Sequence, residues 1–210
     1  MSDIEHQLHP VKEKKPILSI LALCSFFIGL DSIITVPLIP LMTESIHISM
    51  NMGALLVTAY AFVYMICAPL FGTISDQCGR KKMICSGMLF LGLGTALLGI
   101  GRDFNTLLLL RAITGMGAGM LQPNVLAYIS DHYSYEQRGR VMGIIMAAMT
   151  SSTILGVPLG SYFAQVSSWR WTYLTIGLLG MALVLGIYTV IPADNTGKEP
   201  SSRNFSLRRR

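Results

Sequence analysis

The sequence predicts an all-α membrane protein with six transmembrane helices, and two observations support this fold class. Of the 210 residues, 52% are hydrophobic and only 13% are charged, roughly half the charged share of an ordinary soluble domain. Six apolar stretches follow one another, each long enough to cross a hydrocarbon layer of about 30 Å as a helix. Because such stretches far exceed the length of a membrane-spanning β-strand, helices are expected. Little of the chain is left for a water-soluble catalytic domain.

The expected spans cover, in order, residues 17–41, 52–74, 83–101, 105–130, 140–164 and 170–191. The first span is too long for the apolar region of a signal peptide, so we interpret it as an uncleaved helix. Residues 1–16 are expected to form a cytoplasmic tail before the bundle, which occupies 17–191. Residues 192–210 are polar and basic and are expected to form a second cytoplasmic tail or the start of a linker.

The distribution of positive charge predicts the orientation of the bundle. The two tails and the connections after the second and fourth spans carry 13 lysines and arginines, whereas the other connections carry only Arg102 and Arg170. The positive-inside rule therefore places both termini in the cytoplasm of a multi-pass plasma-membrane protein. Because the net charge of +5 follows from this topology and from attraction to anionic lipid, no nucleic-acid partner is expected.

Residues for metal binding or catalysis inside the bilayer are missing from the sequence. The four cysteines form no C-x-x-C pair and have no nearby histidines at ligand spacing, so neither a disulfide framework nor a zinc site is expected. All four histidines lie in expected tails or loops, where none can activate a serine within the membrane. We therefore expect no enzyme, no cofactor and no metal.

Two charged residues, Asp31 and Arg111, lie inside the expected spans. An ionised side chain in the middle of a membrane costs at least about 2.5 kcal/mol on insertion, so both residues are functional candidates. Counted along their helices, both fall in the outer half of the bundle, within reach of each other across an internal cavity. One interpretation is a carboxyl group that takes up and releases a proton beside an arginine. The alternative is a buried ion pair that only fixes helix packing.

A third candidate, Gln122, follows Arg111 on the same span. It lies 11 residues after the arginine and returns to nearly the same helix face. Gly115, Ala118 and Gly119 lie close to this stripe, and we interpret the face as the lining of a cavity. The alternative for the glycines of this span is that they let neighbouring helices approach closely. Gln122 is therefore grouped with Asp31 and Arg111 as a residue for proton coupling or substrate binding.

The connection after the second span resembles a known motif. Residues 72–82 read G-T-I-S-D-Q-C-G-R-K-K, which is similar to the signature G-x-L-a-D-r-x-G-r-k of the major facilitator superfamily, although Gln77 stands where arginine is usual. In that family the opposite charges pair across a cytoplasmic gate in one conformational state, and an acidic residue of the next cytoplasmic loop is a further partner. The resemblance implies that the gate consists of Gly72, Asp76, Gly79, Arg80, Lys81 and Asp131.

Two further stretches carry the same resemblance. Residues 110–119 read L-R-A-I-T-G-M-G-A-G, similar to a motif whose arginine, here Arg111, is implicated in proton coupling. Gly156, Pro158 and Gly160 resemble the antiporter motif G-P-x-x-G-G of the fifth span, with Ser161 in place of the second glycine. With the following W-R-W at 169–171, this form looks most like the bacterial arabinose-efflux and chloramphenicol-resistance branch of drug and sugar proton antiporters.

The resemblance implies the N-terminal half of a twelve-span transporter. Family members have two six-helix halves, each built of two inverted three-helix repeats, with the substrate bound between the halves. The expected function is proton-coupled efflux of small molecules such as drugs or sugars. The expected partners are membrane lipid, the substrate, protons and a second six-helix half from the same gene product or another chain. Two alternatives stay open: transport without strict proton coupling, and a six-helix scaffold or half-transporter subunit that is inactive on its own.

Overall fold

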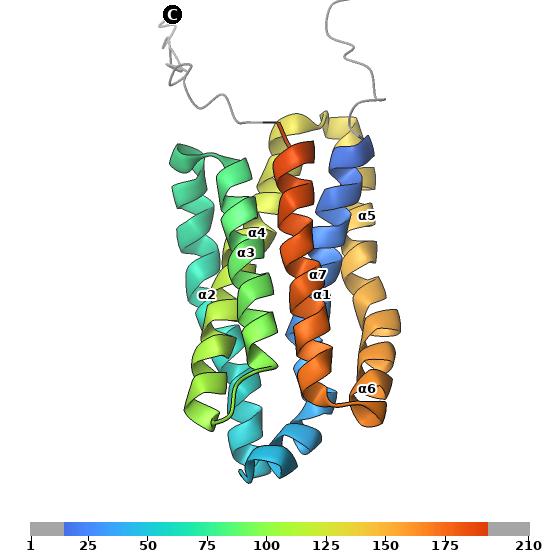
Figure 1. Ribbon diagram of the computed structural model, residues 1–210. Helices are drawn as coiled ribbons and strands as arrows, with labels where there is room; N and C mark the ends of the chain where they lie inside the picture. Colours follow the sequence, from blue (N-terminus) through green and yellow to red (C-terminus); the bar gives the residue numbers. More distant parts are fainter. Residues whose placement is uncertain (1–14, 193–210) are drawn as a thin grey trace, which may run out of the picture.

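The structure is a bundle of helices of membrane-spanning length (Figure 1). The computed structural model describes residues 15–192, and within this range every regular element is helical. The elements are α1 (Lys15–Ile46), α2 (Met50–Cys78), α3 (Arg80–Leu98), α4 (Phe104–His132), α5 (Tyr135–Ser151), the π-helical turn η2 (Ser152–Gly156), α6 (Val157–Val166) and α7 (Trp169–Val190). Because α5, η2 and α6 form one continuous span, the described chain has six spans, and the predicted fold class is confirmed.

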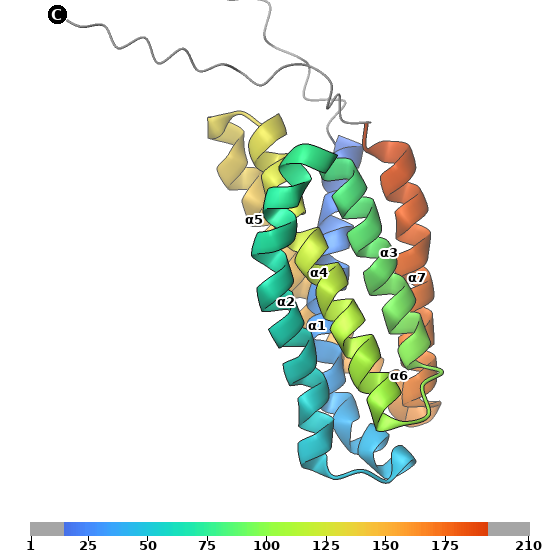
Figure 2. The same cartoon turned by 90° about the vertical axis from the view of Figure 1, so that its left-hand side faces the viewer.

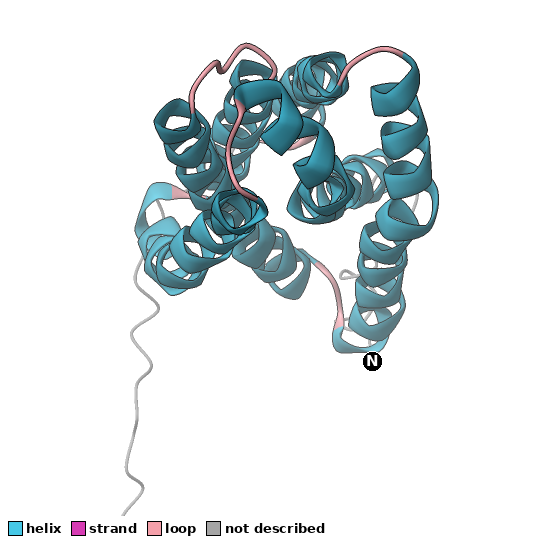
Figure 3. Ribbon diagram, turned by 90° about the horizontal axis from the view of Figure 1, so that it is seen from below, coloured by secondary structure: helices cyan, strands magenta, loops and turns pink. Residues whose placement is uncertain are grey.

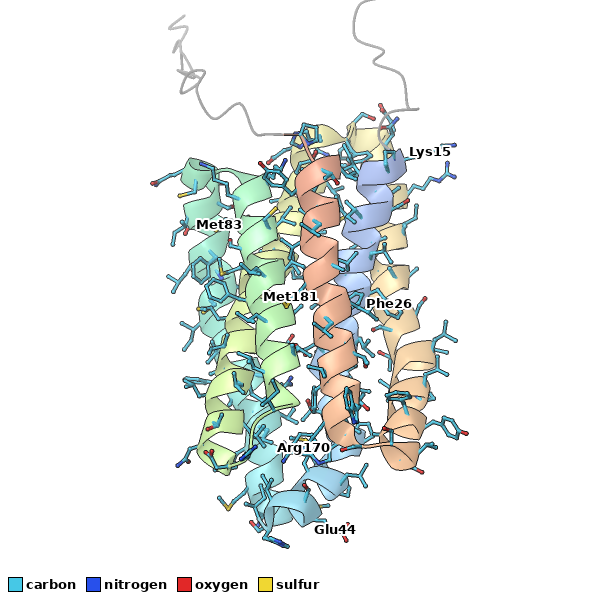
Figure 4. The ribbon with its side chains drawn as sticks, in the orientation of Figure 1. Lys15, Phe26, Glu44, Met83, Arg170 and Met181 are labelled. Carbon is cyan, nitrogen blue, oxygen red and sulfur yellow. The ribbon has the colours of Figure 1, made fainter. Side chains whose placement is uncertain are left out.

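The two ends of the bundle are easily distinguished. Lys15 lies at the end where α1 begins and α7 ends, which we call the terminal end (Figure 4). Glu44 and Arg170 lie at the other end, which we call the distal end (Figure 4). Of the expected tails, 1–16 and 192–210, residues 1–14 and 193–210 lie outside the described residues.

Polar capping residues begin three of the helices. The side chains of Ser49, Asp103 and Ser168 accept hydrogen bonds from backbone amides in the first turns of α2, α4 and α7, which satisfies donors that have no partner within the helix. The helices therefore extend into polar sequence at several ends, beyond the apolar stretches that predict the spans. At its distal end α3 stops at Leu98 rather than at 101, because the chain turns through residues 99–101.

Glycines bring the helices into close contact on one side of the bundle. α4 packs against both α2 and α3, and α3 also packs against α7 (Figure 2). A Cβ atom added to Gly117 on α4 would lie only 2.8 Å from the carbonyl oxygen of Gly87 on α3. A Cβ atom at Gly177 on α7 would lie 2.5 Å from the Cα of Ala96 on α3. Small residues let membrane helices approach closely, so α2, α4, α3 and α7 form one tightly packed unit.

The span α5–α6 packs differently. It lies mainly against α1. Figure 3 shows the helices of the bundle from the distal end. Together with α2 it is the least buried of the six spans. Large apolar side chains are exposed along both, for example Phe62 on α2 and Leu159 on α6. The bundle thus has two poorly covered spans, α2 and α5–α6.

Buried apolar side chains form two separate clusters. The first lies toward the terminal end and includes Ile28, Leu91 and Ala118. The second lies toward the distal end and includes Leu30, Leu98 and Leu110. Each of α1, α3 and α4 contributes to both clusters, and the polar residues that these helices carry between the two sets are the basis of the candidate site.

Candidate functional site

Asp31 and Arg111 meet at the boundary between the two apolar clusters. Asp31 lies in the middle of α1, and Arg111 lies about two turns into α4. Arg111 Nη1 is 3.3 Å from Asp31 Oδ2 and also 3.3 Å from the Asp31 carbonyl oxygen. The residues are 1% and 0% exposed, respectively. The structure therefore brings together the two charged residues that the sequence places inside the spans.

Helices α2 and α3 complete the surroundings of this pair. Thr95 Oγ1 on α3 lies 2.7 Å from Asp31 Oδ1, so each carboxylate oxygen has its own partner. On α2, the Leu56 carbonyl oxygen lies 3.4 Å from Arg111 Nε, and the Tyr60 ring centroid lies 4.5 Å from Arg111 Cζ. Stacking of a guanidinium on an aromatic ring is favourable where water is excluded. Four helices thus hold the ion pair.

Several polar atoms of this region make no hydrogen bond to any described residue. They are the Nη2 of Arg111, the hydroxyl of Tyr60, the hydroxyl of Ser25 and the Oε1 of Gln122. Unpaired buried polar groups are rare in proteins, and each calls for an explanation. Arg111 thus offers a free donor at the ion pair, and Gln122 offers a free acceptor elsewhere on α4.

Gln122 is buried but lies apart from the ion pair. Eleven residues of helix separate it from Arg111, which corresponds to about 16 Å. Its Nε2 approaches Met149 Sδ on α5 at 4.0 Å. Gln122 therefore faces the contact between α4 and α5 and does not join the Asp31 carboxylate.

The expected cavity lining beside Gln122 needs a correction. A Cβ atom at Gly115 would collide with the backbone of Tyr60 on α2, and one at Gly119 would lie 3.1 Å from the Ala68 nitrogen on the same helix. These glycines are pressed against α2, and Ala118 belongs to the first apolar cluster. The small residues of this stripe therefore allow helix packing and do not line a cavity in this structure.

Arg80 is the centre of a second polar group, at the terminal end. Its Nε lies 3.1 Å from Asp131 Oδ2, and its Nη2 pairs with Asp76. Its Nη1 donates to the hydroxyl of Ser75 and lies 3.5 Å from Asn124 Oδ1. One guanidinium thus connects the ends of α2, α3 and α4, which include the acidic residues expected from the sequence.

Three other residues of the expected gate motif have separate roles in the packing. Gly79 adopts a φ of 96° between α2 and α3, a left-handed conformation that glycine adopts without strain. A Cβ atom at Gly72 would meet only Pro123, at 3.9 Å. The Nζ of Lys81 lies 2.8 Å from the Tyr188 carbonyl oxygen on α7.

The residues expected from the antiporter motif lie around the π-helical turn. Cβ atoms at Gly156 and Gly160 would meet Leu30 Cδ1 at 2.6 Å and Ile34 Cδ1 at 2.5 Å, so both glycines admit side chains of α1. Pro158 lies at the start of α6 and is exposed. Single π-turns are frequent at functional sites in helices, and this turn lies beside the part of α1 that carries Asp31.

Sequence reasoning missed the neutral partners at both polar groups. Thr95 and Tyr60 contact the ion pair, while Ser75 and Asn124 contact Arg80. None of them stands out in an apolar stretch, because threonine, serine and tyrosine are common in membrane helices. Thr95 could have been singled out by its position, because it lies inside the third span at the depth of Asp31.

Comparisons with known proteins agree with this architecture. Quinolone resistance protein NorA of Staphylococcus aureus (strain Mu50) is 32% identical over 166 residues, which cover 79% of this chain and 42% of that protein. The uncharacterised MFS-type transporter YwfA of Bacillus subtilis is 31% identical over 172 residues, which cover 80% of this chain and 42% of that protein. The chain thus spans less than half the length of these relatives.

A solved structure and a family profile extend the comparison to most of the chain. The crystal structure of a bacterial homologue of the human lysosomal transporter Spinster, inward-facing and unoccupied, has a TM-score of 0.79 and 16% identity, over 93% of this chain and 47% of that chain. This similarity shows the fold. The profile of the Major Facilitator Superfamily matches residues 21–209. The chain belongs to the Major Facilitator Superfamily.

Proposed function

We propose that the chain is the N-terminal half of a plasma-membrane transporter that exports small molecules, such as drugs or sugars, in exchange for protons. The observation that carries this proposal is the ion pair of Asp31 and Arg111, buried between apolar clusters of membrane-length helices. Ionisable residues inside a membrane are costly and mark ion or substrate pathways. The relative NorA is named as a quinolone resistance protein, which supports efflux.

Asp31 has the geometry of a group that exchanges a proton with a moving cation. While the carboxylate is ionised, Arg111 and Thr95 each bind one of its oxygens. A proton on the carboxyl group removes the attraction to the arginine, which then gains freedom to bind a substrate. The unpaired Nη2 of Arg111 would supply a donor for that substrate, and the Oε1 of Gln122, about 16 Å away along α4, would supply a separate acceptor.

Arg80 and its partners would act as the gate at the terminal end. The positive-inside rule places this end in the cytoplasm. Asp76 and Asp131 are half-exposed or more, so their bonds to Arg80 can break when the bundle meets water on that side. The group would hold α2, α3 and α4 together in one state and release them in the other.

The second half would cover the poorly buried helices. α2 and the α5–α6 span are exposed along their apolar lengths. A Cβ atom at Gly139 or Gly143 on α5 would meet nothing within 4 Å, so this surface has room for another helix. The relatives NorA and YwfA are more than twice the length of the matching region, which fits a second six-helix half in the same gene product.

Transport in everted membrane vesicles tests the proposal. The complete gene product is expressed as wild type, as Asp31→Asn and as Asp103→Asn, and substrate accumulation is measured with and without an imposed pH gradient. Asp103 is the matched control, because it is an exposed aspartate in a connection between helices. We expect Asp31→Asn alone to lose accumulation against a gradient. If it accumulates substrate as fast as wild type, the proton role of Asp31 is wrong, and transport without strict proton coupling becomes the better description.

The intact mass of the natural gene product, recovered from membranes, distinguishes the remaining alternative. A mass near twice 23.0 kDa supports the twelve-span exporter. A mass near 23.0 kDa, together with no flux when the chain is expressed alone, supports the six-helix scaffold or a subunit that needs another chain.

A further inference from the structure

The hydroxyl group of Thr95 faces two acceptors at the same distance. Its Oγ1 lies 2.7 Å from Asp31 Oδ1 on α1 and 2.7 Å from the Leu91 carbonyl oxygen on its own helix. A threonine hydroxyl has one hydrogen to donate and two lone pairs that accept. It can therefore donate fully to only one of these oxygens at a time, while it still accepts from another group.

The backbone around Thr95 is held by close contacts on both sides. One turn before it, Leu91 packs against Gly117 of α4, where a Cβ atom would lie 3.0 Å from the Leu91 Cα. Directly after it, Ala96 packs against Gly177 of α7. Thr95 itself is 1% exposed. Helix packing thus fixes the backbone that carries the hydroxyl, and because its oxygen already contacts both acceptors, only the direction of its hydrogen has to change.

We propose that Thr95 is a positioning residue for the proton of Asp31: its hydroxyl hydrogen turns from Asp31 to Leu91 when the carboxyl group is protonated. With Asp31 ionised, the hydroxyl donates to Oδ1. When Asp31 takes up a proton on Oδ1, the new carboxyl O–H donates to Thr95 Oγ1, and the hydroxyl hydrogen points to the Leu91 carbonyl. No covalent bond of Thr95 breaks, and both hydrogens, that of the hydroxyl and that of the carboxyl group, have an acceptor.

Of the groups around Asp31, Thr95 is the one placed to position this proton. Arg111 of α4 approaches Oδ2 and the main-chain oxygen, so it does not occupy Oδ1. Tyr60 of α2 and Tyr173 of α7 interact electrostatically with Asp31, and the Tyr173 hydroxyl lies 2.8 Å from Thr35 Oγ1 on α1. From η2, Ser152 and Gly156 face this part of α1, and from α6 Gly160 does; none of these residues carries a titratable group. Thr95 is the contact from α3.

Thr95 would therefore help to set the pH at which Asp31 binds and releases its proton. A hydroxyl that donates to the carboxylate stabilises the ionised form. A variant without the hydroxyl therefore keeps the proton to a higher pH. Hydrogen bonds to charged groups are the stronger ones in proteins, and we expect the loss to raise the proton affinity about tenfold, which moves the midpoint by about one pH unit.

Infrared titration of the protonated carboxyl group tests this inference. The inference rests on the proposed function only in that proton exchange at Asp31 is taken to drive transport. The full-length protein in lipid is titrated as wild type, Thr95→Val and Thr95→Ser, and the carboxyl band that disappears in Asp31→Asn is followed. We expect the valine variant to show the midpoint about one unit higher. The serine variant, which restores the hydroxyl, should stay close to wild type. Thr95→Ala also lacks the hydroxyl and must shift in the same direction as valine.

Two results would overturn the inference. One is a valine midpoint equal to that of wild type, or no titrating band at all. The other is an equal shift in the valine and serine variants, since that would assign the effect to packing. The vesicle assay on Asp31→Asn is independent of this titration: coupling retained there refutes the proton role in transport, while the infrared midpoints still decide whether Thr95 positions the proton.

Discussion

Replacement of Arg111 by methionine should destabilise the bundle strongly, and a second change at Asp31 should restore much of the loss. Arg111 is fully buried, and its Nη1 lies 3.3 Å from Asp31 Oδ2. Methionine fills much of the same volume without the charge. The carboxylate is then left among apolar side chains with Thr95 as its remaining side-chain partner.

The expected magnitude follows from what Asp31 must do in the variant. Removal of one member of a buried pair costs about 3 to 5 kcal/mol, because the other charge remains uncompensated. The alternative is to neutralise the carboxylate, which for an aspartate of ordinary pKa near 3.9 costs about 4 kcal/mol at pH 7. The two routes give similar values. Arg111→Met should therefore lose about 3 to 4 kcal/mol, and the double variant with Asp31→Asn should lose about 1 kcal/mol.

Unfolding in mild detergent, monitored at pH 5 and pH 7, measures this cycle. Arg111→Met should regain stability at the lower pH, because protons are then easier to bind, whereas the double variant should not respond. If the single and double variants are equally unstable at pH 7, the pair does not carry the interaction energy that its geometry indicates, and the reasoning is refuted.

Other contacts give further predictions, each readable from unfolding curves. Gly177→Ala should cost about 1 to 3 kcal/mol, because the new Cβ meets the α3 backbone; its control, Gly143→Ala, adds a Cβ in open space and should be neutral or slightly stabilising, so equal losses would contradict the packing argument. Asp131→Asn should cost no more than about 1 kcal/mol, since this carboxylate is half-exposed, and a larger loss would show that the pair is better shielded than its exposure indicates. Thr106 amide and hydroxyl groups lower the pKa of Asp103 below 3.8, so the stability that Asp103 adds by capping α4 is complete above that pH and is lost as the pH falls further. Asp103→Asn should still cap α4 at neutral pH but should not show this loss of stability in acid. If the variant loses as much stability in acid as wild type, Asp103 is not the group responsible.

Much of the fold could be predicted from the sequence because a bilayer imposes strict conditions. An apolar stretch of about 20 residues must form a helix to satisfy its backbone, so the number of spans was predictable. Charged residues inside such stretches are rare enough to be noticed, as Asp31 and Arg111 were. The pairing of Arg80 with Asp76 and Asp131 was foreseen from a motif resemblance, not from physical reasoning on spacing alone.

The neutral parts of the site could not be predicted, because they depend on how the helices are rotated and paired. Thr95 contacts Asp31 only because α3 and α1 approach each other at that depth. The cavity lining assigned to Gly115 and Gly119 was wrong for the same reason: small residues suit both a cavity and a close helix contact, and the structure selects contact with α2. Helical periodicity identifies a face, but not the neighbour of that face.

Under the proposed function, the close contacts around Asp31 would couple its proton to a change of shape. Arg111 and Thr95 belong to α4 and α3, which are packed backbone to backbone through Gly117, and such packed interfaces deform little. Asp31 belongs to α1, which contacts α5 and the π-turn on its other side. A displacement of α1 against the α3–α4 unit changes the contacts of both carboxylate oxygens together. In the proposed proton exchange, the proton affinity of Asp31 would then depend on the position of α1, and by linkage the position of α1 would depend on the proton.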